Sequence, residues 1–513
     1  MNADQREGVR SNALYLRNVR PLDPAEISEY VEGQPHPAAV RQVLRESAVE
    51  IGLIEREDGL FVPVEEGPVT AVTDTGGESV GGEFAGIESF PERYGRVLED
   101  LLVERYGAGW PEGESGRAIR ERIRAVKESY LRGEAVDYDE DTALAYALYH
   151  LPGYYAATQY VLAELVADRL VPRRLRVLDV GAGVGGPALG LCDLLPDDAL
   201  LDYHAVEPGA GADVLEAMLA ETGRNVHATV HRTTAEAFDP SAVAADDGDT
   251  DAGSAGAFDL VLFSNVLSEL EDPEGVIREY ADALADDGTL VALAPADRNT
   301  ATGLRAVERG VVDRGPYTVY APTVRLWPGV SPGDECWSFD VKPDLDVPDF
   351  QRRLDEAVAD ETAAGGVGSG DEDGTDGNDE REGGEFVNVD VQYAYSLLRL
   401  DGRRRYDFDL DASVVARFAD SETHVTNRVD CYAAKLSHDL SEGGNPLFLL
   451  GDGSQQVSHY AVLTRQSALN ADLLSADYGE VLAFENVLML WNDDEQAYNL
   501  VVDDETVVDR VPL

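Results

Sequence analysis

The sequence contains little lysine and little cysteine. Only three of its 41 basic residues are Lys, and its three Cys residues (Cys192, Cys336 and Cys431) lie far apart in a chain of 513 residues. An odd number of widely spaced thiols excludes a disulfide framework, and the absence of a CxxC pair argues against a zinc site. The sequence also lacks a signal-peptide core after Met1 and any apolar run long enough to span a bilayer. We therefore expect a soluble, cytoplasmic protein without a bound metal.

The charge of the chain is strongly one-sided. Acidic residues number 99 against 41 basic residues, which gives a formal net charge of -58. Disorder would explain such a balance, but apolar residues recur at helix and strand spacings along most of the chain, which favours a folded protein. We expect a surface adapted to very high salt, because at molar salt the Debye length falls to about 3 Å and self-repulsion is screened. The global charge neither supports nor excludes RNA binding.

Changes of pattern divide the sequence into five predicted regions. The first is a small helical module that ends in a hairpin with its turn at Asp58-Gly59, an order that fits a winged helix or a generic helical cap. Strands alternate with helices in the fourth region, which predicts an α/β fold with a mostly parallel sheet. An acidic, Gly-rich insertion at 362–385 is expected to be disordered. The regions are the module at 1–66, a linker at 67–88, a helical region at 89–170, the α/β region at 171–410 and an all-strand region at 411–513.

A glycine-rich turn follows the first predicted strand of the α/β region. The strand ends in Asp179, and the pattern D-x-G-x-G-x-G continues through Gly181, Ala182, Gly183 and Gly185. Glycines at these positions let the backbone turn tightly and approach a ligand closely. The helix that starts just after them directs its N-terminus at that ligand. The pattern predicts a nucleotide-type cofactor pocket.

Several neighbouring residues decide which cofactor this pocket would take. Glu207 ends the second strand, 22 residues after Gly185, where its carboxylate can accept from both ribose hydroxyls. The same glycines satisfy the dinucleotide pattern G-x-G-x-x-G, so NAD is the alternative. We favour S-adenosylmethionine because Asp179 precedes the first glycine by two residues, where it can hold the turn or the methionine amine. Ser264 and Asn265, after a later strand, resemble a substrate-facing methyltransferase segment. Glu236 either accepts from the adenine amino group or is simply a solvated acid.

Three further segments make the chain resemble the methyltransferase-like proteins of the small ribosomal subunit, which occur in mitochondria, bacteria and archaea. The resemblance covers roughly residues 141–400. Tyr146 to Ala157 is similar to that family's entry segment, residues 321–339 to its A-P-C…C-P…W-C-H-F segment, and residues 392–398 to its late strand. The resemblance implies a Rossmann-like class I methyltransferase fold and an association with ribosomal RNA or small-subunit assembly. It leaves the target nucleotide and the methylated atom undefined.

The resemblance also raises the question of a metal cluster. Some members of the family carry an iron–sulfur cluster on the cysteines of the second segment. This sequence has Thr323 and Trp327-Pro328 at two of those positions and keeps only Cys336. One thiolate cannot hold a cluster that takes four. We therefore expect neither an iron–sulfur cluster nor zinc here.

The last hundred residues predict an OB-like β-barrel. Five strands, with a short helix after the third, resemble the single-strand-binding OB domains. Such domains stack bases on aromatic side chains, and the residues expected to do so here are Phe448, Tyr460 and Trp491. Each of these rings can equally be a core residue.

These features leave three functions open. The first is methylation of ribosomal RNA, with Asp179, Gly181, Gly183 and Glu207 holding S-adenosylmethionine. The second is a ribosome-assembly factor that binds the cofactor without turnover. The third is a small-molecule or protein methyltransferase with appended domains. No residue of the sequence identifies a catalytic base.

Overall fold

The computed structural model describes residues 1–70, 84–132, 136, 138–244, 258–364 and 384–513. The predicted linker and the predicted acidic insertion lie largely outside these residues. The chain divides into two compact units, Met1–Asp259 with Pro343–Val391 and Leu260–Lys342 with Gln392–Leu513. In the parts of the chain that the structure describes, no helix combines the length and the apolar character needed to cross a membrane.

The first unit begins with a small module of helices and one hairpin. Asp23 caps its second helix by accepting a hydrogen bond from the Ala25 amide at 2.8 Å, and Leu22 pairs antiparallel with Phe61 of the hairpin. The module thus has the helices and the hairpin that the sequence predicts, and the choice between a winged helix and a generic helical cap stays a prediction. The elements are α1 (Ala3–Leu16), α2 (Pro24–Tyr30), α3 (Pro37–Glu46), α4 (Ala48–Ile51), β1 (Leu53–Glu55) and β2 (Phe61–Pro63).

Three helices follow, as the sequence predicts for residues 89–170. They are α5 (Glu92–Tyr106), α6 (Gly113–Arg132) and α7 (Glu140–Ala167). Asp139 caps α7 by accepting from the Thr142 amide at 2.8 Å. Most residues of α7 are buried, and glycines bring the next helix close to it. A methyl group added at Gly190 would lie 2.6 Å from the Tyr155 carbonyl oxygen.

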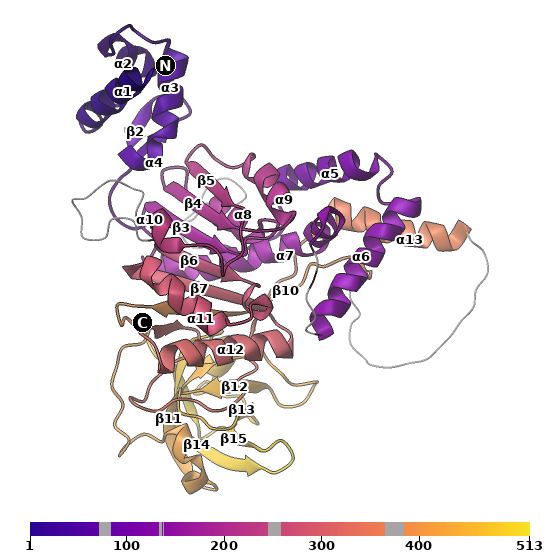
Figure 1. Cartoon of the computed structure of the whole chain (residues 1–513). Helices are drawn as coiled ribbons and strands as arrows, with labels where there is room; N and C mark the ends of the chain where they lie inside the picture. Colours follow the sequence, from indigo (N-terminus) through magenta and orange to yellow (C-terminus); the bar gives the residue numbers. More distant parts are fainter. Residues whose placement is uncertain (71–83, 133–135, 137, 245–257, 365–383) are drawn as a thin grey trace. The chain divides into compact units, whose positions relative to one another are not determined.

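Three neighbouring strands of the first unit form a parallel sheet (Figure 1). In the first unit, β3 (Arg174–Val180), β4 (Leu200–Val206) and β5 (Val226–His231) are parallel, and Asp179 pairs with Ala205. The helices between and after these strands are α8 (Gly186–Leu194), α9 (Gly211–Leu219) and α10 (Pro240–Ala244), and α13 (Asp349–Ala364) belongs to the same unit.

The second unit contains the later strands. Within it β10 lies between β7 and β8 in hydrogen-bonded order, with β9 also paired to β10. Strand β10 runs antiparallel to both β7 and β8, which makes the sheet mixed and confirms the predicted last strand near residue 392. The remaining elements are β6 (Phe258–Ser264), α11 (Pro273–Tyr280), β7 (Leu284–Pro295), α12 (Arg298–Asp313), β8 (Thr318–Ala321), β9 (Asp340–Lys342) and β10 (Val391–Arg399).

The C-terminal strands close a five-stranded barrel, as predicted. The strand order is β11-β12-β13-β15-β14, β11 also pairs with β14, and β16 extends the edge at β14. Strands β13 and β15 are parallel, and the short helix α14 follows the third strand, as the OB-like prediction requires. The elements are β11 (Arg428–Lys435), β12 (Leu447–Gly451), β13 (His459–Leu463), α14 (Asp472–Ser475), β14 (Val481–Asn492), β15 (Ala497–Val502) and β16 (Val507–Arg510).

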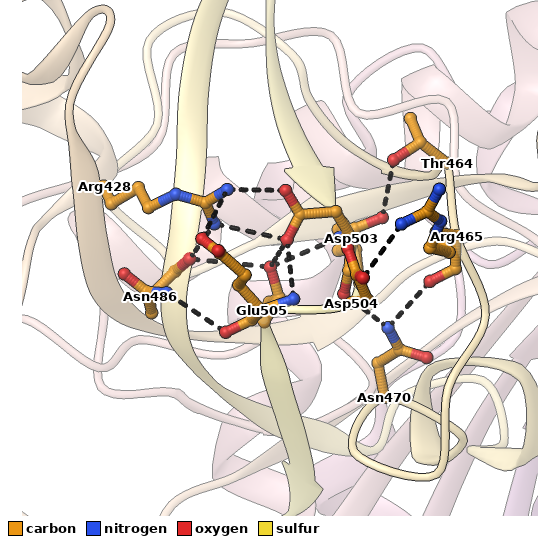
Figure 2. Close-up of polar contacts among 10 residues, drawn as sticks. Arg428, Thr464, Arg465, Asn470, Asn486, Asp503, Asp504 and Glu505 are labelled. Carbon is orange, nitrogen blue, oxygen red and sulfur yellow. Dashed lines mark hydrogen bonds and ion pairs between the residues drawn. The ribbon is translucent and has the colours of Figure 1, made fainter.

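An acidic turn joins β15 to β16 and is flanked by an arginine on each of its two sides (Figure 2). Arg428 Nη2 lies 2.5 Å from Asp503 Oδ2, and Arg465 Nη1 lies 2.9 Å from Asp504 Oδ2. The Asn470 side chain donates to the Asp503 carbonyl oxygen at 2.8 Å. These contacts fix the turn and offset the repulsion between adjacent carboxylates.

One outer face of the barrel is covered by other parts of the second unit. Trp327 donates from Nε1 to Asp452 Oδ2 at 2.7 Å, and Ser338 donates to the Leu436 carbonyl oxygen at 3.0 Å. The apolar side chains buried there are Val324, Leu326, Trp327, Cys336, Tyr406, Ala434, Leu436, Leu449 and Val481. The barrel therefore shares a core with residues 324–336 of its own unit.

Candidate functional site

The glycine turn after β3 has the backbone conformation that the sequence predicts. Gly181, Gly183 and Gly185 have φ values of 71°, 54° and 97°, a region that side-chain-bearing residues rarely adopt. The amides of Gly181 and Ala182 donate to the Val206 carbonyl oxygen at 2.8 and 3.2 Å. The turn is thus held against the end of β4, and α8 begins directly after it.

Glu207 lies at the end of β4, where it holds the glycine turn. Its Oε2 accepts from the Gly183 amide at 3.0 Å, and its Oε1 accepts from the Gly209 amide at 2.8 Å. The residue is 9% exposed. Burial raises the pKa of the carboxyl group, while the amides of Gly209 and Gly183 oppose this shift. Each carboxylate oxygen keeps a second lone pair, so Glu207 can still accept from a ribose hydroxyl.

The side chain of Asp179, near the end of β3, is completely buried. Its Oδ2 accepts a short hydrogen bond from the Tyr203 hydroxyl. Among the described residues, its Oδ1 has no hydrogen-bond partner. Burial raises the pKa of Asp179 to about 7, with a smaller contribution from the charge of Glu207, while the Tyr203 hydroxyl opposes the shift. The sequence assigned Asp179 to the turn or to the methionine amine; the structure adds Tyr203 as its partner.

Whether S-adenosylmethionine fits the site depends on the space beside the turn and on Asp179 Oδ1, the oxygen that has no hydrogen-bond partner among the described residues. A methyl group added at Gly183 would have only the Gly181 carbonyl oxygen near it, at 4.0 Å. At Gly211, the first residue of α9, an added methyl group would lie 3.0 Å from the Gly183 carbonyl carbon and oxygen. The turn is therefore open on one side and closely packed against α9 on the other. Together with the acceptor oxygens of Asp179 and Glu207, this arrangement fits the cofactor.

The other four predicted cofactor residues are Ala182, Glu236, Ser264 and Asn265. Glu236 is exposed in the loop after β5, and Ala182 is buried in the turn. Ser264 and Asn265 follow β6 in the second unit, where Ser264 is 7% exposed and the Asn265 amide donates to the Leu293 carbonyl oxygen at 2.9 Å. Their roles stay predictions.

An aromatic cluster of Tyr130, Tyr138, Tyr146, His150 and Tyr154 lies beside the turn and was not assigned a role from the sequence. A methyl group added at Gly186 would lie 2.8 Å from Tyr154 Cβ, and one added at Gly209 would lie 3.5 Å from Tyr138 Cβ. The spacing of residues 146, 150 and 154 on α7, four apart each time, places three of these rings on one helix face. This four-residue spacing is the sequence pattern from which the cluster could have been predicted.

A cavity of about 240 Å³ lies in the same unit, between α5, α7 and the start of α9. It contains none of the predicted cofactor residues. It is lined by Leu101, Glu104, Arg105, Glu140, Leu144, Ala210, Asp213 and Val214.

The three aromatic residues predicted to stack bases do not form one platform. Phe448 is 3% exposed and belongs to the barrel core, so its ring offers no face to a base. Tyr460 packs against the covered outer face of the barrel. Trp491 pairs with Tyr498, which pairs with His459, so Trp491 and Tyr460 point to opposite faces of the sheet. The expected stacking groove is not assembled from these residues.

Cys336, the remaining cysteine of the resembling segment, is fully buried in the second unit. Burial raises the pKa of its thiol to about 12. Within the described residues, no group of three His, Cys, Asp or Glu side chains is placed to hold a metal ion. The expectation of no cluster and no zinc stays a prediction.

Three protein families match parts of the chain. A methyltransferase domain matches residues 154–320. The N-terminal domain of a domain of unknown function, DUF8157, matches residues 6–57, and the C-terminal domain of DUF8157 matches residues 419–511. No curated protein matches the sequence.

Solved structures similar to this chain include several methyltransferases. A putative O-methyltransferase from Nostoc punctiforme is 16% identical, with 57% of this chain and 76% of that chain covered and a TM-score of 0.24. The plantazolicin methyltransferase BpumL is 11% identical over 45% of this chain and 82% of its own, with a TM-score of 0.25. The YcgJ protein of Bacillus subtilis is 23% identical over 24% of this chain, with a TM-score of 0.18, and the chain spans 45% of its length.

The domain match contains the whole glycine turn and Glu207. It confirms the predicted methyltransferase fold and, with it, S-adenosylmethionine as the cofactor. A relation to the small ribosomal subunit is a separate, finer prediction.

Proposed function

We propose that this protein transfers a methyl group from S-adenosylmethionine to an acceptor bound beside the glycine turn. The observation that carries the proposal is the link between Glu207 and the Gly183 amide at 3.0 Å. It joins the ends of β3 and β4 at the carboxyl edge of a parallel sheet, where ligands of α/β proteins bind.

Each residue of the site has a separate task in this proposal. The backbone of Gly181, Gly183 and Gly185 gives the cofactor close access, since no side chain occupies that space. Glu207 orients the turn and keeps lone pairs for the ribose hydroxyls. Asp179 lies behind the turn as a negative or hydrogen-bond-accepting group. The cofactor supplies an electrophilic methyl group, and transfer then depends mainly on an aligned nucleophile.

Ribosomal RNA of the small subunit is the acceptor that the sequence resemblance supports. The resembling segments keep their order around the glycine turn, from Tyr146 through Cys336 to the late strand. The acidity of the chain does not oppose this acceptor in molar salt, where long-range repulsion is screened.

A small-molecule acceptor is the second candidate, and one observation favours it. The outer barrel face near Tyr460 and Leu449 is covered by residues 324–336 of the same unit. That face is therefore not open to a single strand, which removes one reason to favour RNA.

The experiment that separates these candidates maps the methyl marks of ribosomal RNA by mass spectrometry in cells with and without the gene. Loss of one mark supports RNA methylation. Unchanged marks with defective small subunits support an assembly role without turnover. Unchanged marks with normal subunits contradict both ribosomal roles and leave the small-molecule acceptor.

A further inference from the structure

The aromatic cluster has a stack of rings along one face of α7. The rings of His150 and Tyr154 are nearly parallel, with an angle of 10° between their planes and 5.4 Å between their centroids. Tyr146 is tilted by 42° against His150, with 4.7 Å between the two centroids, and Tyr138 meets Tyr146 edge to face at 5.6 Å. The stacked pair is therefore His150 and Tyr154, and an offset-stacked pair can be extended by a further planar ring.

The cluster is not a closed core. Tyr130, Tyr138, His150 and Tyr154 are partly exposed, and only Tyr146 is buried. Aromatic side chains that gather on one face and stay partly exposed are typical of a surface that binds a ligand.

The cluster lies between two parts of the cofactor site. Tyr154 contacts the start of α8 at Gly186, directly after the turn, and Tyr138 lies beside Gly209, whose amide donates to Glu207. The row of rings therefore runs from the ribose-binding carboxylate towards the glycine turn, within the same unit.

The polar groups of the cluster lie at ring edges. The hydroxyls of Tyr130 and Tyr138 are hydrogen-bonded at 2.7 Å, and the Tyr130 hydroxyl is 3.5 Å from that of Tyr146. Burial, together with the charge of Lys127, lowers the pKa of His150 to about 3. His150 is thus neutral near neutral pH, and its ring packs among those of Tyr130, Tyr146, Tyr149 and Tyr154.

We infer that the aromatic cluster binds the flat heteroaromatic ring that carries the methyl acceptor, by stacking on the face of Tyr154 that His150 does not cover and by hydrogen bonds from the tyrosine hydroxyls to the edge of that ring. This inference rests on the proposed methyl transfer. It names a chemical class that a base of RNA and a free heteroaromatic molecule share.

The test is saturation-transfer NMR on the full chain in molar KCl with saturating S-adenosylmethionine, which occupies the adenine site. The free probes are uridine, cytidine, guanosine and indole, and the non-planar control is 5,6-dihydrouridine. We expect the planar probes to bind and the non-planar control to bind much more weakly. Tyr154→Leu and His150→Leu should each weaken binding about fivefold or more, since one stacked ring contributes about 1 kcal/mol or more.

Matched variants keep the test specific. Tyr154→Phe and His150→Phe keep a ring and should retain binding of the planar probes. Tyr15→Leu removes a tyrosine that is 80% exposed in the N-terminal module and should change nothing. The inference is overturned if planar probes bind no better than dihydrouridine, or if both leucine variants bind them unchanged while their melting curves match that of the unaltered protein.

A second arm distinguishes the two sources of the ring. If oligouridylate binds more tightly than uridine and its binding depends on Tyr154 and His150, the ring is a base presented by RNA. If only the free probes bind, the ring belongs to a small molecule. Calorimetry with S-adenosylmethionine distinguishes failure of the proposed methyl transfer from failure of ring binding. If the unaltered protein does not bind the cofactor, the proposed function fails; if it binds the cofactor but no planar ring, only the inference fails.

Discussion

The Glu207 carboxylate accepts a hydrogen bond from the Gly183 amide, and the two residues lie at the ends of neighbouring parallel strands. The contact makes one side chain responsible both for the shape of the glycine turn and for the expected ribose contact. Because Glu207 also binds the Gly209 amide, its removal leaves two backbone donors without their acceptor.

Glu207→Ala should weaken binding of S-adenosylmethionine by roughly 1.5–3 kcal/mol, the range for hydrogen bonds to charged groups. Glu207→Gln is the matched control, because its amide oxygen still accepts from one backbone donor, and we expect a smaller loss. Isothermal titration in molar KCl measures both. Equal affinities for the alanine variant and the unaltered protein would show that Glu207 does not contact the cofactor.

Asp179→Asn should change how stability depends on pH. Burial raises the pKa of Asp179 from 3.8 to about 7 in the folded protein, so the folded state binds more protons than the unfolded state between these values. The contribution of this group to stability is therefore present below pH 3.8 and is lost as the pH rises towards 7. The Asn variant does not ionise and should melt a few degrees higher than the unaltered protein near pH 8, roughly one unit above the folded pKa.

The same comparison near pH 4 is its control. There the native aspartate is protonated, so the two melting temperatures should differ much less. A difference of the same size at both pH values would contradict the buried, proton-binding position of Asp179.

Salt should stabilise the fold. A net charge of -58 produces repulsion that molar KCl screens, and ion pairs such as those of the Asp503 turn offset only part of it. Circular dichroism melts in low and molar KCl compare the melting temperatures and check this expectation. A melting temperature that falls as KCl rises would count against an adapted acidic surface.

Removal of the barrel should disrupt the second unit. The predicted boundary at residue 411 would let a chain ending near Leu410 keep all the predicted cofactor residues, but the structure gives a different expectation. Buried Arg305 donates to the Tyr478 hydroxyl at 3.2 Å, and Trp327 donates to Asp452. Truncation would leave these groups buried or newly exposed without partners, at a cost of several kcal/mol. We expect an aggregated or protease-sensitive product, and a soluble, cooperatively melting fragment would contradict the shared core.

Much of the fold follows from the sequence, for physical reasons. The alternation of strands and helices, the positive-φ glycines after Asp179 and the acid at Glu207 are local patterns, and each is found where expected. The caps Asp23 and Asp139 mark helix starts in the same way. Such features depend on the residues of one turn or strand.

The parts that could not be predicted depend on packing between distant segments. Tyr203 follows Asp179 by 24 residues and meets it only because β3 and β4 are paired. The sequence fits Phe448 equally well as a core residue and as a stacking residue, because only the register of β12 decides which face of the strand its ring occupies. The covering of the barrel by residues 324–336 has no local signature either, because it depends on which apolar faces meet.

The most direct test of the cofactor site is calorimetric titration of S-adenosylmethionine into the unaltered protein, Gly183→Arg and Gly443→Arg in molar KCl. Both glycines have positive φ and space for a side chain, so the two variants introduce the same charge and similar backbone strain. We expect one bound cofactor per chain in the unaltered protein and in Gly443→Arg, and no binding in a folded Gly183→Arg. Unchanged affinity in Gly183→Arg would contradict the assignment of the glycine turn to the cofactor site.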